Sequence, residues 1–245
     1  MTKAAAYRGH ARRQGMRRFD GLIFDKDGTL FSFDATWGEW TERILARLSR
    51  DVTHRSAMAR TLGFDPVTRR FDRRSPVIAG TPEDVALLLR RHLSGWSLGR
   101  LVAFLDAEAA DVTLQSPTPL RPLLESLGAA GLTLGLATND SEAAARAHLQ
   151  SVGVEDLFRF IAGYDSGYGA KPTPGMLHAF LDVTGHTPGR CAMIGDSLHD
   201  LHAGRSAGMA TIGVLTGPAD RAELEPHADH VLGSIAELGA LVLNR

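Results

Sequence analysis

Two aspartates stand two positions apart directly after a short apolar segment, in the run Phe24-Asp25-Lys26-Asp27-Gly28-Thr29-Leu30. If Gly21–Phe24 is a buried strand, both carboxylates project from its carboxyl end rather than into the core, and Gly28 permits a sharp turn there. Such a pair can supply a nucleophile, a proton donor or oxygen ligands for a metal ion. A calcium loop does not fit, because the glycine comes too early and no Glu closes the loop at Thr36. A turn cap is the structural alternative.

Three further polar clusters lie where other predicted strands end. Thr138-Asn139-Asp140 follows the apolar run Leu132–Ala137, and Lys171-Pro172 precedes a helical stretch. Gly195-Asp196-Ser197 follows Ala192–Ile194, with Asp200 one helical turn later. Each cluster alone has an ordinary explanation, such as a helix cap or a solvated lysine. Because open α/β sheets bind ligands at the carboxyl ends of their strands, the clusters together indicate one site.

The rest of the sequence supplies elements that would hold these residues. Short apolar runs bounded by Gly, Asp or Asn are typical of buried parallel strands. We assign strands to Gly21–Phe24, Leu132–Ala137, Phe160–Ala162, Ala192–Ile194, Thr211–Leu215 and Val231–Leu232. We assign helices to Leu120–Ala130, Ser141–Val152, Pro174–Thr184 and Leu198–Ala207. This alternation predicts an α/β fold with a doubly wound, Rossmann-like parallel sheet.

The interval between Leu30 and Pro117 breaks the alternation, because it contains helical patterns and no convincing strand. We assign its helices to Trp37–Leu48, His54–Leu62, Glu83–His92 and Leu98–Ala110. Before the third, Thr81 is a predicted N-cap, with Pro82 at the first helical position and Asp84 three residues after the cap. We therefore predict a helical cap domain at 32–115, inserted after the first strand and lying over the carboxyl edge of the sheet. The catalytic core would comprise 19–31 and 116–245.

The composition and charge of the chain limit the kinds of partner and the location that we expect for it. The net charge of -1 gives no electrostatic case for nucleic acid or a membrane surface. No apolar run approaches the roughly 20 residues that span a bilayer, and no signal peptide is recognisable. We expect a cytoplasmic monomer or homodimer. Residues 1–18 carry arginines and no acid, which predicts a basic, disordered extension; a transit peptide or a nucleic-acid arm are alternatives.

Together the four clusters resemble the four motifs of the haloacid-dehalogenase superfamily, and the resemblance covers Arg18 to about Ser234. The helical insert resembles the type 1 cap of that superfamily. Phe24–Leu30 and Gly195–Asp200 are most similar to phosphoglycolate phosphatases. One residue departs from the pattern: many relatives carry Lys after the Thr-Asn pair, where this chain has Asp140. We expect no phosphate-binding role for Asp140.

The resemblance implies a magnesium-dependent phosphatase that acts on a small phosphorylated metabolite. Asp25 would attack phosphorus to form an aspartyl-phosphate, and Asp27 would protonate the leaving oxygen and later deprotonate the attacking water. Asp25, Asp196 and the backbone carbonyl of Asp27 would hold Mg²⁺. Because several negative charges lie close together at this site, we expect the carboxyl group of Asp27 to be protonated at the start of the reaction.

The remaining motif residues would bind phosphate or support those that do. The resemblance implies that Thr138, Asn139 and Lys171 contact the phosphoryl oxygens together with Asp25. Asp200 would hold a water on the metal or orient Lys171.

Other chemistries of this superfamily fit less well. Dehalogenases lack the second aspartate of the first motif, here Asp27. Phosphonatases and related sugar phosphomutases use a cap lysine, yet Lys3, Lys26 and Lys171 are the lysines of this chain and none lies in 32–115. A catalytically inactive binding module would not need the full set of motif residues. A nucleotide-binding Rossmann protein would need a glycine fingerprint or P-loop, which the sequence lacks.

The substrate prediction has two alternatives. The resemblance favours 2-phosphoglycolate, with a sugar phosphate or nucleotide as the alternative. In the cap, Arg69, Arg70, Arg73 and Arg74 are candidate anchors for a substrate carboxylate, although a solvated face is the simpler interpretation. We expect His199 and His202 to be surface or supporting residues and not metal ligands.

Overall fold

The computed structural model describes residues 19–243, so the predicted N-terminal extension lies outside the described part. Its centre is a six-stranded sheet in the order β5-β4-β1-β6-β7-β8, and every neighbouring pair is parallel. The strands are β1 (Gly21–Phe24), β4 (Thr133–Ala137), β5 (Phe160–Ala162), β6 (Cys191–Gly195), β7 (Ala210–Val214) and β8 (His230–Leu232). The predicted doubly wound α/β fold is confirmed, and β1 lies between β4 and β6.

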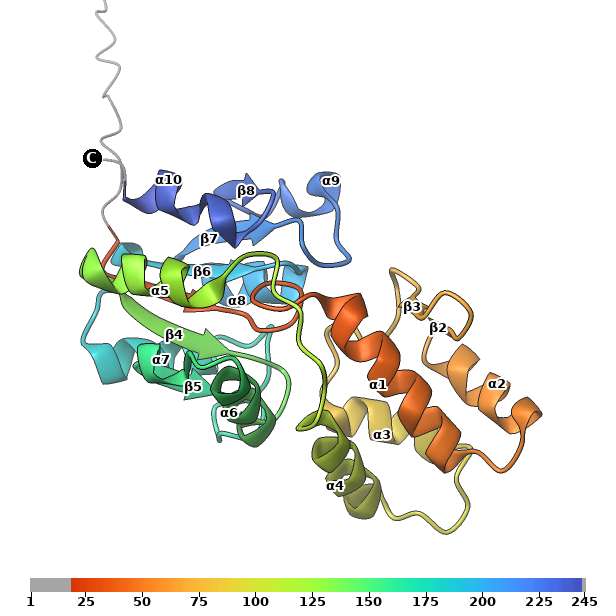
Figure 1. Cartoon of the computed structure of the whole chain (residues 1–245). Helices are drawn as coiled ribbons and strands as arrows, with labels where there is room; N and C mark the ends of the chain where they lie inside the picture. The colour runs from red at the N-terminus through yellow and green to blue at the C-terminus, as the bar shows by residue number, and fades with distance from the viewer. Residues whose placement is uncertain (1–18, 244–245) are drawn as a thin grey trace, which may run out of the picture.

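Helices cover both faces of this sheet (Figure 1). They are α5 (Leu120–Ala129), α6 (Glu142–Ser151), α7 (Gly175–Thr184), α8 (Leu198–Ser206), α9 (Arg221–Leu224) and α10 (Leu238–Val242). Leu22 and Phe24 of β1 belong to a core cluster with α5, α6 and α10, whereas Ile23 belongs to a second cluster with α7 and α8. Successive side chains of a strand point to opposite faces, so burial on both faces explains why the strands read as continuous apolar runs.

A second group of elements lies beside the carboxyl ends of the strands (Figure 1). It contains α1 (Phe33–Leu48), α2 (Val52–Thr61), α3 (Pro82–Arg90) and α4 (Leu98–Ala109), which pack around their own apolar cluster. We refer to residues 32–115 as the cap. Thr81 and Asp84 form the expected capping box at the start of α3, with Pro82 at its first position. Of the helices between residues 19 and 243, none is long and apolar enough to cross a membrane.

The cap also contains a hairpin that the sequence pattern did not predict. β2 (Phe64–Asp65) and β3 (Arg70–Phe71) pair antiparallel, so the expectation of no strand in this interval was wrong. Two-residue strands are too short for an alternating pattern to reveal. Between them the chain turns at Arg69, whose φ is 55°.

The two connections between cap and core run side by side. The backbone N–H of Ser32 donates to the carbonyl of Gln115 at 2.7 Å. The cap is therefore anchored where β1 ends, and its inner surface faces the edge of the sheet that carries the polar clusters.

Candidate active site

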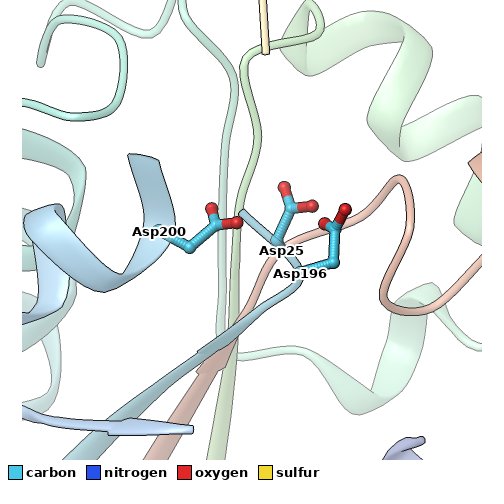
Figure 2. A group of neighbouring side chains, drawn as sticks. All are labelled: Asp25, Asp196 and Asp200. Carbon is cyan, nitrogen blue, oxygen red and sulfur yellow. The ribbon is translucent and has the colours of Figure 1, made fainter. Parts of the chain in front are cut away.

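Three adjacent strands deliver the predicted residues to one place. Asp25 follows β1, Thr138 follows β4, and Asp196 follows β6. The backbone N–H of Asp25 donates to the carbonyl of Ile194 at 2.8 Å, which continues the β1–β6 pairing up to the nucleophile position. Figure 2 shows the carboxylates of Asp25, Asp196 and Asp200 gathered at this edge, just beyond the strand ends.

A lysine joins two of these carboxylates. Lys171 Nζ lies 2.5 Å from Oδ1 of Asp25 and 2.7 Å from Oδ1 of Asp200, and all three side chains are buried. Burial works against the charge of Lys171, but the attraction of Asp200 and Asp25 is larger and raises its pKa. Asp200 Oδ2 also accepts from the backbone N–H and hydroxyl of Ser197, so both of its oxygens are engaged.

The acidic cluster has the properties of a site for a hard cation. Asp25, Asp196 and Asp200 each offer an oxygen, and these atoms lie within 4.8 Å of one another. Burial, only partly offset by Lys171, raises the pKa of Asp25 to about 7, and repulsion from Asp200 and Asp27 adds to the increase. Burial and then repulsion from Asp25 and Asp200 raise the pKa of Asp196 well above its usual value. Oxygen ligands and excess negative charge both suit Mg²⁺.

Two glycines make room for Asp196. A Cβ on Gly217 would lie 1.7 Å from Oδ2 of Asp196, and one on Gly28 would lie 2.4 Å from the same carboxyl group. Gly28 also has a φ of +85°, a conformation that L side chains rarely adopt. The role of Gly28 as a turn was predicted from the sequence. Gly217 was missed, because it lies far along the chain in the loop after β7 and belongs to no recognisable pattern.

The residues of the second cluster line the cavity, and one of them also supports the backbone of Lys171. Thr138 is buried beside the carboxylates, and its hydroxyl accepts from the N–H of Asp140. Asn139, which is expected to contact phosphate, accepts with its amide oxygen from the N–H of Lys171 at 2.8 Å. Its amide nitrogen donates to the carbonyls of Lys171 and of Ala79 in the cap, at 2.9 and 2.8 Å. Asn139 thus holds the Lys171 backbone and contacts the cap.

A buried lysine beside Asp27 was not predicted to belong to the site. Lys26 Nζ lies 2.7 Å from Oδ2 of Asp27, 3.0 Å from Oδ2 of Asp140 and 2.9 Å from Nδ1 of His148. Two signals were present in the sequence: a lysine between the two aspartates, and an acid at Asp140, the position where the motif resemblance leads one to expect Lys. Read together, they indicate a charge pair between the first and second motifs.

The motif residues of the core line one side of a cavity, and the cap lines the other side. The two sides differ in polarity. The core contributes carboxylates, Lys171, Thr138 and Asn139. The cap contributes mainly apolar side chains, among them Phe33, Trp37, Trp40, Val77, Ile78, Val85 and Leu105. Its one side-chain hydroxyl at the cavity, that of Thr81, is bonded to Asp84.

The four candidate anchor arginines lie elsewhere. Their positions are not among the residues that line the cavity. Arg69 pairs with Glu42 at 2.6 Å, Arg70 lies 3.9 Å from Asp34, and Arg73 pairs with Asp220 of the core at 2.9 Å, all with largely exposed side chains. Arg74 is exposed as well. The β2–β3 hairpin directs this stretch to the outer surface, so the structure does not bring the arginines to the motif residues.

The two histidines near Asp200 do not join the cluster of potential metal ligands in the described residues. His199 lines the cavity and is half-buried, and burial is the main cause that lowers its pKa. His202 is exposed and stacks edge-on against His227, with ring centroids 5.0 Å apart.

Comparison with known proteins agrees with this arrangement. A family model described as haloacid dehalogenase-like hydrolase matches residues 19–208. A phosphoglycolate phosphatase of Rhodospirillum rubrum is 28% identical over 211 residues, which cover 78% of this chain and 77% of that protein. A protein of Dickeya dadantii named "Probable phosphatase IndB" is 30% identical over 202 residues, 80% of this chain and 81% of its own. Some other phosphoglycolate phosphatases match over about half of their length.

A solved structure shares the fold. The crystal structure of a predicted phosphoglycolate phosphatase from Haemophilus somnus superposes with a TM-score of 0.70 at 20% identity. The match covers 93% of this chain and 99% of that one. The cap and the core are both included in a match of that extent.

Proposed function

Because the chain belongs to the haloacid dehalogenase-like hydrolase family, we propose that it is a magnesium-dependent phosphomonoester hydrolase with Asp25 as its nucleophile. The observation that carries this proposal is the convergence of Asp25, Asp196, Asp200 and Lys171 at the base of one cavity. Phosphate monoesters hydrolyse extremely slowly alone, and a covalent intermediate divides the reaction into two easier steps.

In the first step, a carboxylate oxygen of Asp25 attacks phosphorus and the bond to the leaving oxygen breaks. Asp27 gives its proton to that oxygen. Lys171 holds Asp25 in place and, with Thr138, offers positive charge and a donor to the phosphoryl oxygens as negative charge develops on them. In the second step, Asp27 takes a proton from water as the water attacks the aspartyl-phosphate, which releases phosphate and restores Asp25.

Asp25 and Asp196, with the backbone carbonyl of Asp27, are the residues that would hold Mg²⁺. When bound, the ion neutralises charge on the carboxylates and on the transferring group. The engaged oxygens of Asp200 favour the second of its two expected roles, the orientation of Lys171.

The test is a rate measurement on purified protein with p-nitrophenyl phosphate. Activity should depend on Mg²⁺, and Asp25→Asn should lower turnover by roughly 10⁴-fold or more. Turnover of Asp25→Asn within tenfold of wild type would rule out the nucleophile assignment.

The names of the relatives make 2-phosphoglycolate the first physiological substrate to test. The lining of the cavity favours a second candidate, a phosphate ester of an uncharged and largely apolar group. No arginine or lysine of the cap lines the cavity to pair with a carboxylate, and aromatic and aliphatic side chains face the place where the leaving group would lie. The same lining offers few polar partners to a sugar phosphate or a nucleotide.

One rate measurement distinguishes the two candidate substrates. We compare kcat/KM for 2-phosphoglycolate, for 2-hydroxyethyl phosphate as its neutral analogue of similar size, and for phenyl phosphate. A paired carboxylate contact would contribute about 1.5–3 kcal/mol, or roughly ten- to a hundredfold in favour of 2-phosphoglycolate. If the apolar lining selects the substrate, phenyl phosphate ranks first, and Arg69→Ala, Arg70→Ala, Arg73→Ala and Arg74→Ala leave the ranking unchanged.

A further inference from the structure

Lys26 carries a charge in a place that water does not reach. Its side chain is fully buried at the junction of core and cap. An ammonium group has three N–H donors and no acceptor. Nδ1 of His148 lies at hydrogen-bond distance from it, 2.9 Å, and carboxylate oxygens of Asp27 and Asp140 form ion pairs with it at 2.7 and 3.0 Å. Because Asp140 supplies the compensating negative charge, Lys26 adds no net charge to the site.

The cap fixes the hydrogen-bonding state of His148. Nε2 of His148 lies 2.7 Å from the backbone carbonyl of Ala109, the last residue of α4. A carbonyl can only accept, so Nε2 carries the hydrogen. Nδ1 of the neutral ring is then an acceptor, as its contact with the ammonium of Lys26 requires. The carbonyls in the last turn of a helix have no partner within that helix, which leaves the carbonyl of Ala109 free for this contact.

A second cap residue completes the surroundings of Lys26. Its ammonium nitrogen lies 5.2 Å from the ring centroid of Trp37 on α1, a cation–π distance. Trp37 also contacts His148, with ring centroids 6.4 Å apart. Elements from the cap therefore touch the Lys26 group at two points, through α1 and through α4.

The carboxyl group of Asp27 is held by one oxygen. Oδ2 faces Lys26, whereas Oδ1 is buried without a hydrogen-bond partner in the described structure. Asp27 lines the cavity. A buried oxygen without a partner is costly, so the contact of Oδ2 with Lys26 is the polar contact that fixes the orientation of this carboxyl group.

We propose that Lys26, Asp140 and His148 are positioning residues that orient the carboxyl group of Asp27 for proton transfer, with His148 docked on the Ala109 carbonyl of the cap. The proposal deepens the proposed phosphatase function and rests on it. In this arrangement the cap does more than cover the substrate. It supplies the contact that makes His148 an acceptor, and His148 in turn helps to hold the lysine against Asp27.

The test compares kcat/KM for two esters that differ in their leaving group. A general loss of structure lowers both values alike and leaves their ratio unchanged. For wild type, His148→Ala, His148→Gln and Asp140→Asn, we measure kcat/KM with p-nitrophenyl phosphate and with an alkyl phosphate such as 2-hydroxyethyl phosphate. The value of kcat/KM depends only on the steps up to and including the departure of the leaving group. The later role of Asp27 as a base therefore does not affect it. An alkoxide needs a proton to leave, and p-nitrophenolate hardly does.

We expect His148→Ala to lower kcat/KM for the alkyl ester by roughly 10- to 100-fold, the range found for outer partners of functional groups in metal sites. The loss with p-nitrophenyl phosphate should stay within about threefold by the same reasoning. Asp140→Asn should show the same selectivity with a smaller loss, because the amide oxygen can still accept from Lys26. His148→Gln should recover part of the activity, because its amide can accept from Lys26 and donate to the Ala109 carbonyl.

The control is His186→Ala, which removes another hydrogen-bonded histidine of the core, one that contacts Thr133 away from the cavity. It should leave the ratio of the two rates unchanged. Equal losses for both esters in His148→Ala and Asp140→Asn, or no loss in either, would overturn the proposal. The proposed phosphatase function is tested separately. If wild type is active and Asp25→Asn is not, that function stands even when the proposal about His148 and Asp140 fails.

Discussion

Asp25→Asn should make the metal-free protein more stable while it removes the activity. In the folded chain Asp25 is buried beside Asp196 and Asp200, and one lysine serves two of the three carboxylates. Asparagine keeps the shape of the side chain and removes a negative charge from this cluster. Lys171 keeps Asp200 as its partner in the variant.

The size of the effect follows from the pKa of Asp25, which rises from 3.8 to about 7 on folding, with the attraction of Lys171 already included. A raised carboxyl pKa means that the folded chain binds the proton more tightly than the unfolded chain. The stability from Asp25 is therefore fully present below pH 3.8 and is lost as the pH rises through about 7. At pH 7.5 the loss approaches about 4 kcal/mol, and at pH 5.5 it is about 2 kcal/mol, at 1.36 kcal/mol per pKa unit.

Thermal unfolding in EDTA measures this directly. For a chain of this size, each kcal/mol shifts Tm by about 2–4 °C. We expect Asp25→Asn to raise Tm by up to roughly 8–16 °C at pH 7.5 and by about half as much at pH 5.5. Asp196 adds in the same direction, because the charge of Asp25 helps to raise its pKa.

Two comparisons make the prediction decisive. Asp182→Asn, which removes an exposed carboxylate on α7, should leave Tm nearly unchanged. Saturating Mg²⁺ should stabilise wild type, by about 2.7 kcal/mol at a hundredfold excess over Kd, and should stabilise Asp25→Asn much less. A lower Tm for Asp25→Asn in EDTA, or a gain that is larger at pH 5.5 than at pH 7.5, would refute the reasoning.

Three further outcomes follow from the same geometry. Asp27→Asn should lower kcat/KM for an alkyl phosphate by about 10²–10⁴-fold and far less for p-nitrophenyl phosphate; steady-state rates for both esters check this, and equal losses contradict it. Asp196→Asn should raise the Mg²⁺ concentration for half-maximal activity, and EDTA should abolish wild-type turnover reversibly; full turnover in EDTA contradicts a metal requirement. Lys26→Met should lower the unfolding free energy by about 3–5 kcal/mol in urea, and adding Asp140→Asn should restore part of it, because the unpaired charge is gone.

The sheet was predictable because most of its strands are buried on both faces, the edge strand β8 excepted. Each of the six reads as a short apolar run, and the structure shifts their ends by one residue at most. The motif residues were predictable for a related reason. Asp25, Thr138 and Asp196 follow strands, and the parallel order of β4, β1 and β6 brings the ends of those strands together.

The contacts of the cap were not predictable, because they depend on how two separately packed units meet. Nothing near Ala109 in the sequence indicates that its carbonyl accepts from His148. The arginine-rich stretch was ambiguous for the same reason. Its composition suits an anchor, but the hairpin of two-residue strands decides which way it faces, and that hairpin leaves no periodic signal.

The two contacts between cap carbonyls and core side chains have a common consequence. Asn139 bonds the carbonyl of Ala79 and holds the backbone of Lys171, while His148 bonds the carbonyl of Ala109 and holds Lys26. The cap thus reaches both lysines of the site through backbone groups, which do not depend on the identity of the cap side chains. Apart from Trp37, whose ring lies near Lys26, the apolar side chains of the cap line the cavity without a contact to either lysine that the described structure records. We therefore expect substitutions at cavity positions such as Trp40 or Val85 to change the substrate preference while the two backbone contacts stay the same.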